Sequence, residues 1–245
     1  MERFARAKDD GFESVEFWDY RQRDLAAMGK AAAQAAIAIS GFNGDADYSL
    51  VDPDQKRQYV DALQQSIAAA KTIGAESLTI HSNALGVGGV VVNHYHELSS
   101  TVKLCSMYGT LQECAERAEK AEINLHLEAL NVLTDHAGNF LTTTRMGAEM
   151  VRLIGSDRLK LLYDAYHMQL NEGKICDTIT EYIDVIGHVH IADAPGRHEP
   201  GTGELNYKNI ISHLDNLGYR YRVGCELFPL QDTATAVQAI MAVYP

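Results

Sequence analysis

The stretch Gly187–Tyr207, GHVHIADAPGRHEPGTGELNY, begins as a strand and ends as a loop. His188 and His190 alternate with apolar residues, a period of two that predicts an extended strand with both histidines on one face. The loop then adds three titratable side chains, Arg197, His198 and Glu199. Turns need glycine and proline but not charged groups, so the stretch predicts a functional loop at a strand end. The alternative is a buried strand whose histidines are hydrogen-bonded core residues.

Apolar strand patterns alternate with helical patterns on both sides of this stretch. The expected strands are SVEFW (14–18), AAIAIS (35–40), SLTIHS (77–82), INLHLEAL (123–130), LKLLYDA (159–165), the strand from 187, and YRVGCEL (221–227). The expected helices cover about 2–10, a segment from about 20, 54–73, 98–120, 142–154, 175–186, 207–217 and the residues after 232. This alternation predicts a parallel sheet with right-handed crossovers. Eight helices predict an α/β fold of the (β/α)8 TIM-barrel type, as a single domain over residues 1–245.

Seven expected strands against eight helices leave one strand unaccounted for, because the chain starts on a helix. We expect either that the first strand is missing at the N-terminus of this sequence or that the first and last strands pair directly. A barrel short of one strand has two unpaired edges, which favours self-association into a homo-oligomer. An open doubly wound sheet is the alternative architecture, but no GxGxxG motif follows the first strand.

The composition narrows the class of partner. Lys and Arg number 21 and Asp and Glu 33, a net charge of −12 that repels phosphate groups. We therefore expect a small-molecule substrate, with no nucleic acid and no membrane as partner. Apolar runs have the length of strands, and charges stand where a signal peptide has its apolar core, so we expect a cytoplasmic protein. The four cysteines form no CxxC motif and are expected to be reduced packing residues.

Four polar residues stand at or near the carboxyl ends of expected strands, the end that carries the active site in a (β/α)8 barrel. They are Glu128, Asp164, His190 and Glu226. Strand alternation turns all four inward, so they can meet in one mouth. Three carboxylates repel one another unless a cation lies among them, so the set predicts one divalent metal ion. Oxygen donors with one nitrogen favour Mn²⁺ or Mg²⁺, with Co²⁺ next. For any one residue, the alternative is a solvated group at the rim.

Other residues are expected around this set. His167 is expected to contact a substrate oxygen or a metal-bound water, with a helix cap or rim position as the alternative. Arg197 is expected to contact substrate oxygens through its charge or its paired donors. Glu16, His126 and His188 are expected to support the metal ligands from a deeper layer. His81 is expected to have a core or supporting position, with a place lining the mouth as the alternative. Trp18 and Phe42 are expected to pack in the core, with a place in the pocket wall as the alternative.

These motifs resemble the hydroxypyruvate isomerase family within the xylose isomerase-like (endonuclease IV-like) TIM barrels. The most specific match is GHVHIADAPGRHEPGTGELNY, and the supporting matches are HLEALN around Glu128, LLYDAYHMQ around Asp164 and GCELFP around Glu226. The resemblance implies that Glu128, Asp164, His190 and Glu226 bind one divalent metal. It also implies that Glu128 and Glu226 act as acid and base, and that His167 and Arg197 contact the substrate.

The expected activity is metal-dependent aldose–ketose isomerisation of a small hydroxy-carbonyl compound by enediolate proton transfer. Ala129 stands where the family commonly has Pro, and Leu227 and Phe228 stand where it has a Tyr-Lys pair. Without that Lys a substrate carboxylate loses one anchor, so a 3-epimerase of uncharged ketoses, of the tagatose/psicose type, is the alternative. An abasic-site endonuclease would need an Asp where Gly196 stands. A non-catalytic sugar-binding barrel would not need both glutamates.

Overall fold

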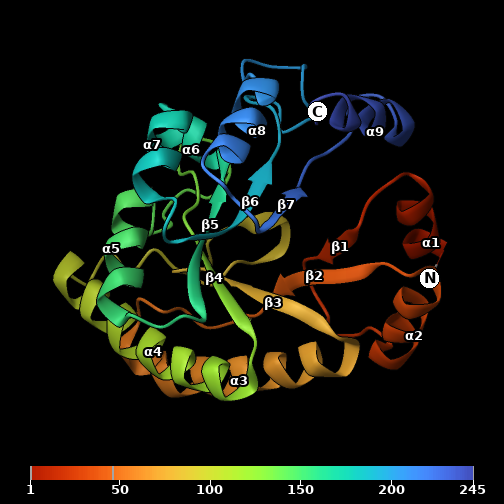
Figure 1. The fold of residues 1–245 in the computed structure, drawn as a ribbon. Helices are drawn as coiled ribbons and strands as arrows, with labels where there is room; N and C mark the ends of the chain where they lie inside the picture. Colours follow the sequence, from red (N-terminus) through yellow and green to blue (C-terminus); the bar gives the residue numbers. More distant parts are fainter. Residues whose placement is uncertain (1, 46, 245) are drawn as a thin grey trace.

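A computed structural model describes residues 2–45 and 47–244. Seven parallel strands pair in sequence order and curl into a nearly closed barrel with helices on its outside (Figure 1). The strands are β1 Ser14–Phe17, β2 Ala38–Asn43, β3 Ala75–Ile80, β4 Asn124–Glu128, β5 Leu159–Asp164, β6 Ile186–Ile191 and β7 Arg222–Cys225. The helices are α1 Glu2–Asp9, α2 Leu25–Ala35, α3 Lys56–Ile73, α4 Ser100–Ala121, α5 Thr144–Ile154, α6 Ala165–Asn171, α7 Ile175–Tyr182, α8 Tyr207–Asn216 and α9 Thr233–Met241, with short 3-10 helices η1 Pro53–Gln55 and η2 Val87–Gly89. The expected barrel is confirmed.

Two expected boundaries near the N-terminus are wrong. The strand expected at 35–40 begins only at Ala38, because the alanine-rich run continues α2 to Ala35. Ala36 then takes a left-handed conformation and ends that helix. The helix expected from about residue 20 begins at Leu25, because the side chain of Asp24 accepts a hydrogen bond from the backbone N–H of Ala27.

Helix α6 was not expected, and it starts directly after β5. Its cap is Asp164, whose Oδ1 accepts hydrogen bonds from the backbone N–H groups of Tyr166 (2.8 Å) and His167 (3.2 Å). One carboxylate oxygen of Asp164 is therefore used to start a helix. The other oxygen remains free to face the barrel mouth.

The first and last strands do not pair in the part of the chain that the structure describes, so direct closure between them is wrong. A side chain reaches across the gap instead: Glu16 of β1 contacts His188 and His190 of β6. Gly224 of β7 makes room for it, since a Cβ there would collide with Oε1 of Glu16. That a further strand precedes this sequence stays a prediction.

The expected orientation of the strand residues is observed. Leu161, Tyr163, Val189 and Ile191 are buried in the layer between strands and helices. Phe42 also belongs to this core, where it stacks on Phe17 with ring centroids 5.2 Å apart. Helical cover of the strands' outer face explains why these positions are apolar on every strand.

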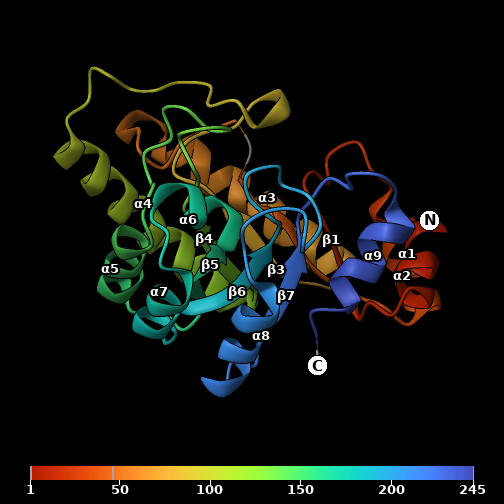
Figure 2. The same ribbon diagram turned by 90° about the horizontal axis from the view of Figure 1, so that it is seen from above.

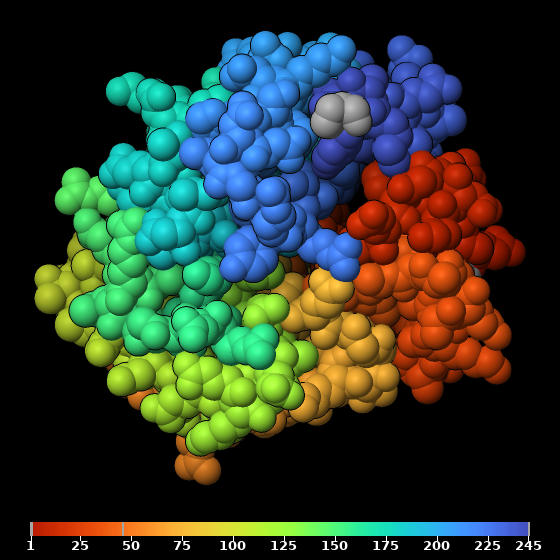
Figure 3. Space-filling model, viewed as in Figure 1, coloured from red at the N-terminus to blue at the C-terminus, as the bar shows by residue number. Residues whose placement is uncertain are grey.

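The first and last helices, α1 and α9, are neighbours on the outside of the barrel (Figures 2 and 3). A Cβ on Gly11 would lie 3.5 Å from Cε of Met241, which shows how closely the two segments pack. Across the described residues, no helix is both long enough and apolar enough to cross a bilayer.

The loops after β3 and β4 lie together at one end of the barrel (Figure 2). The backbone N–H of Phe140 donates to Oδ1 of Asn83 (2.9 Å), and that of Leu141 donates to Oγ of Ser82 (3.0 Å). These bonds join two loops that flank the carboxyl ends of the strands, so the mouth on this side has a fixed shape.

Candidate active site

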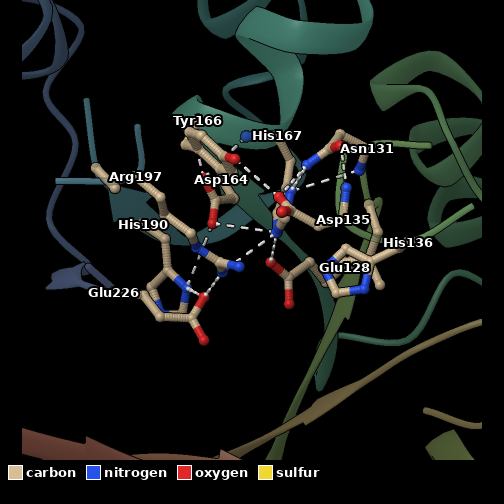
Figure 4. Close-up of polar contacts among 12 residues, drawn as sticks. Glu128, Asn131, Asp135, His136, Asp164, Tyr166, His167, His190, Arg197 and Glu226 are labelled. Carbon is tan, nitrogen blue, oxygen red and sulfur yellow. Dashed lines mark hydrogen bonds and ion pairs between the residues drawn. The ribbon is translucent and has the colours of Figure 1, made fainter. Parts of the chain in front are cut away.

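The barrel mouth brings together the four residues expected as metal ligands (Figure 4). One ligand atom from each of Glu128, Asp164, His190 and Glu226 lies within 4.8 Å of the others. Nδ1 of His190 is 3.4 Å from Oε2 of Glu226 and 4.0 Å from Oδ2 of Asp164. Their role as ligands stays a prediction, but the grouping that this role requires is present.

Three donor atoms of this cluster are buried and have no hydrogen-bond partner among the described residues: Oε1 of Glu128, Oδ2 of Asp164 and Nδ1 of His190. Buried polar atoms normally have partners, because an unpaired one costs free energy. Burial raises the pKa of Asp164 by more than the charges of Arg197 and His190 lower it, so the carboxylate's surroundings do not fully offset its burial. A divalent cation would satisfy all three atoms at once. The residues therefore fit a metal ion, and three carboxylates with one imidazole fit Mg²⁺ or Mn²⁺.

Glu128 is held by a buried histidine. Nε2 of His81 lies 3.1 Å from Oε2 of Glu128, and its Nδ1 lies 3.0 Å from Oδ2 of Asp45. Burial lowers the pKa of His81, but the two carboxylates outweigh burial and raise it to about 10. The protonated ring donates to both carboxylates and orients Glu128. His81 thus takes the supporting position expected from the sequence.

Glu226 is held as an ionised carboxylate by three neighbours. Nη2 of Arg197 donates to its Oε2 (2.7 Å), and Nε1 of Trp18 donates to its Oε1. Burial alone would raise the pKa of Glu226, but the His190 contact, the charge of Arg197 and the Trp18 hydrogen bond together lower it far below its ordinary value. Trp18 is half exposed and walls the mouth, so the expectation that it serves only core packing is wrong.

Arg197 and His167 lie next to this cluster. The guanidinium of Arg197 lies 5.2 Å above the centre of the Tyr166 ring, and its Nε is buried without a partner. His167 is fully buried on α6, with Nε2 3.4 Å from Nη2 of Arg197. Its Nδ1 is 2.7 Å from Nδ2 of Asn131. Burial lowers the pKa of His167 to about 3, so the ring is neutral. His167 is therefore neither a helix cap nor a rim residue.

A family model described as "Xylose isomerase-like TIM barrel" matches residues 4–243. The chain belongs to this family. The match covers nearly the whole chain and agrees with the fold observed, so the family expected from the sequence motifs is confirmed.

Curated relatives match this xylose isomerase-like barrel over nearly its whole length. The hydroxypyruvate isomerase of Escherichia coli (strain K12) is 29% identical over 246 residues, covering 97% of this chain and 91% of the relative. The 2-oxo-tetronate isomerase of Cupriavidus necator is 28% identical over 249 residues, covering 97% of this chain and 90% of the relative. The expectation that the protein is an enzyme of the isomerase class is confirmed at this level.

Solved structures show the same fold at lower sequence identity. An AP endonuclease of family 2 from Brucella melitensis has a TM-score of 0.88 at 23% identity, covering 98% of this chain and 92% of that chain. A D-psicose 3-epimerase from Clostridium cellulolyticum H10 has a TM-score of 0.82 at 18% identity, covering 99% and 90%. At these identities the likeness concerns the fold alone.

The titratable residues of the loop after β6 divide into two kinds in this xylose isomerase-like barrel. Arg197 faces the cluster, whereas His198 and Glu199 hold the loop in place. Nδ1 of His198 donates to the carbonyl oxygen of Phe228 (2.6 Å), and Oε2 of Glu199 accepts from the backbone N–H of Leu230 (2.9 Å). These bonds join the loops after β6 and β7. The geometry agrees with a functional role for Arg197, whereas the bonds of His198 and Glu199 hold two loops together.

Glu16 occupies the supporting position expected for it. Its Oε1 is 3.3 Å from Nε2 of His188, and its Oε2 is 3.3 Å from Nε2 of His190. Burial raises the pKa of Glu16, but the charges of the two histidines lower it well below its ordinary value. Holding Nε2 of His190 leaves Nδ1 turned toward the cluster, the arrangement by which carboxylates orient metal-binding histidines. His126 lies deeper, stacked on His188 at 5.3 Å.

We expect the Glu16→Gln variant to bind Mn²⁺ about 10- to 100-fold more weakly, because an amide holds the His190 ring less well than a carboxylate does. Isothermal titration of the purified, metal-free protein with MnCl₂ measures the change. Glu13→Gln is the matched control, because Glu13 is 86% exposed in its side chain and pairs with Arg222 outside the cluster. Equal Mn²⁺ affinity in Glu16→Gln and wild type would show that Glu16 does not orient the ligand.

Sequence reasoning missed five residues around the mouth: Asp45, Asn131, Asp135, His136 and Tyr166. Asp45 follows β2 closely and carried the same signal as the other strand-end carboxylates. It was missed because the expected strand ended at Ser40, which placed Asp45 well inside a loop. The other four lie in the loop after β4 or on α6, where the strand-end rule does not apply.

Proposed function

We propose that this protein is a metal-dependent isomerase of a small 2-oxo acid with a hydroxyl group beside its carbonyl, of the hydroxypyruvate or 2-oxo-tetronate kind. One observation carries the proposal: three buried donor atoms without partners converge beside a guanidinium that also has a free donor. Such a site suits a divalent cation together with an anionic oxygen ligand. Glu128, Asp164, His190 and Glu226 would hold Mn²⁺ or Mg²⁺, with Co²⁺ next.

The chemistry moves one proton between neighbouring carbons. When bound, the cation supplies positive charge that stabilises the enediolate form of the substrate. Glu128 and Glu226 flank the position of the substrate, and one of them takes the proton from the hydroxyl-bearing carbon. A carboxylate then returns a proton to the former carbonyl carbon, and the hydroxyl proton moves to the other oxygen, so atoms and charges balance. The hydrogen bonds from His81 and Trp18 keep the two glutamates in position.

Arg197 is the proposed anchor for the substrate carboxylate. Its Nε has no partner, and the ring of Tyr166 beneath the guanidinium fixes its plane. A carboxylate on this edge would form charge-assisted hydrogen bonds and would compete with Glu226 for the guanidinium. Arg197 thereby takes the role of the lysine that the family resemblance leads one to expect where Leu227 and Phe228 stand. His167 Nε2, on the same side, is placed to contact a substrate oxygen.

A ketose 3-epimerase is the second candidate, favoured by the absence of that lysine. The same two glutamates would serve it, since an epimerase takes a proton from one face of a carbon and returns it to the other face. The two reactions differ only in where the proton is returned. The ligand set is common to both.

Proton NMR in D₂O tests the proposal and separates the two reactions. We expect the Mg²⁺-loaded protein, offered hydroxypyruvate, 2-oxo-tetronate and a panel of ketoses, to introduce deuterium beside the carbonyl of a 2-oxo acid. The same sample with EDTA should show none. An isomerised acid supports the isomerase, and an inverted ketose supports the epimerase. No metal-dependent exchange with any of these compounds would contradict both.

A further inference from the structure

The loop after β4 presents a buried hydrogen-bond acceptor that the proposed mechanism does not use. Nδ1 of His136 lies 2.7 Å from the backbone carbonyl oxygen of Gly89. A carbonyl oxygen only accepts, so Nδ1 carries the proton and Nε2 is left with a lone pair. That Nε2 is buried and has no partner in the part of the chain that the structure describes, and His136 is only 6% exposed. Burial lowers the pKa of His136, in keeping with a neutral ring.

His136 lies at the mouth, in line with the proposed substrate contacts. Its ring meets the edge of the His167 ring with centroids 5.2 Å apart, and His167 contacts Arg197 at 3.4 Å on its other side. In Figure 4, Glu128 lies between His136 and Glu226. Arg197, His167 and His136 thus form a row beside the cluster, with a cationic donor at one end and a neutral acceptor at the other.

Contacts on both sides fix the position of His136. Gly89 has a φ of +77°, and a Cβ there would lie 2.7 Å from Cε1 of His136, so glycine is required for the close approach. The preceding residue is fixed as well, because Oδ2 of Asp135 accepts from Tyr166 Oη (2.8 Å) and Asn131 Nδ2 (2.8 Å). Because the acceptor is held in one position, it can bond well only to a ligand whose donor group lies at a matching position.

A hydroxyl group, rather than a second cation, fits this acceptor. Asp135, His136 and His167 do place ligand atoms within 4.8 Å of one another. Nδ1 of His167 and Oδ2 of Asp135 are already hydrogen-bonded by Asn131 and Tyr166, and the guanidinium of Arg197, 3.4 Å from Nε2 of His167, would repel a cation bound there. Nε2 of His136 is the atom left without a partner, and a single hydroxyl hydrogen satisfies it.

We propose that His136 accepts a hydrogen bond from the terminal hydroxyl of a four-carbon 2-oxo acid and so selects it over a three-carbon acid. This inference rests on the proposed function. In the proposed binding mode, the substrate's carboxylate contacts Arg197, and its carbonyl and the neighbouring hydroxyl lie at the cluster. The hydroxyl on the fourth carbon of a four-carbon acid then lies along the row, toward His136. A three-carbon acid has no group to reach it and leaves the acceptor unpaired, which costs about 1–3 kcal/mol. That cost corresponds to roughly 5- to 150-fold in kcat/KM.

The test compares 2-oxo-tetronate with hydroxypyruvate in wild type, His136→Phe and His136→Gln. We expect wild type to favour the four-carbon acid by at least about fivefold in kcat/KM. The ratio of kcat/KM for 2-oxo-tetronate to kcat/KM for hydroxypyruvate should fall in His136→Phe, which removes the acceptor. It should be partly restored in His136→Gln, whose amide oxygen can accept a hydrogen bond. An unchanged ratio in a folded His136→Phe protein would overturn the inference.

A binding measurement on wild type needs no variant. The non-reacting acids tetronate and glycerate are titrated into Mg²⁺-loaded protein and followed by the fluorescence of Trp18, the single tryptophan of the chain. We expect tighter binding of tetronate, and equal affinities would overturn the inference. If wild type isomerises both acids with equal kcat/KM, only this inference fails. If it isomerises neither, the proposed function fails as well.

Discussion

Replacing Glu226 by glutamine is expected to lower kcat by about 1000-fold or more, with a smaller effect on KM. An amide cannot take or return a proton, and the variant also loses an ionised contact with His190 and Arg197. Glu128→Gln should have an effect of the same order, because the proposed mechanism uses both carboxylates. Deuterium incorporation into the substrate, followed by NMR, measures the chemical step directly in each variant.

The matched control is Glu204→Gln, on the same side of the barrel. Glu204 is exposed and contacts Gln169 at 3.1 Å, away from the cluster. Its replacement should leave kcat within about twofold of wild type, as surface changes usually do. Titration of Glu226→Gln with Mn²⁺ shows whether its lower activity comes from weaker metal binding or from loss of the carboxylate that transfers the proton. A variant that binds metal and retains kcat within tenfold of wild type would remove Glu226 from the proton transfer.

Removing the divalent cation is expected to abolish activity, with recovery on addition of Mg²⁺ or Mn²⁺. Without the cation, the negative charge that develops on the substrate loses a stabilisation worth several kcal/mol. Dialysis against EDTA followed by an activity assay measures the loss. Because all four ligands bind in their deprotonated forms, we expect affinity for Mn²⁺ to fall as the pH is lowered.

Trp18 reports cation binding independently of activity. It is the single tryptophan of the chain and it donates to Glu226, so its emission should change when that carboxylate binds metal. Glu226→Gln should blunt the response at equal Mn²⁺ concentration. Full activity after exhaustive chelation would contradict the metal-dependent mechanism. An emission change without any turnover would favour the non-catalytic sugar-binding role.

Strand-end residues could be found from sequence because a parallel barrel has a fixed polarity. Once strands and helices alternate, every strand ends at the same rim, and Glu128, Asp164, His190 and Glu226 follow from a period of two. The same rule reaches Asp45 only when the end of β2 is placed correctly. There the alanine-rich run, which suits a helix as well as a strand, displaced the expected strand by three residues at both ends: residues 35–40 were expected, and β2 is Ala38–Asn43.

The sequence by itself determined the barrel architecture, the inward face of each strand and the four strand-end donors, because these depend on periodicity within a segment. Only the tertiary structure decided which polar groups have partners. Arg197 and His198 are neighbours in one loop, yet Arg197 faces the cluster and His198 bonds to the carbonyl oxygen of Phe228. The lone pair of His136 is likewise set by the carbonyl of Gly89, 47 residues away. Such pairings arise from contacts between loops distant in sequence, and no local pattern encodes them.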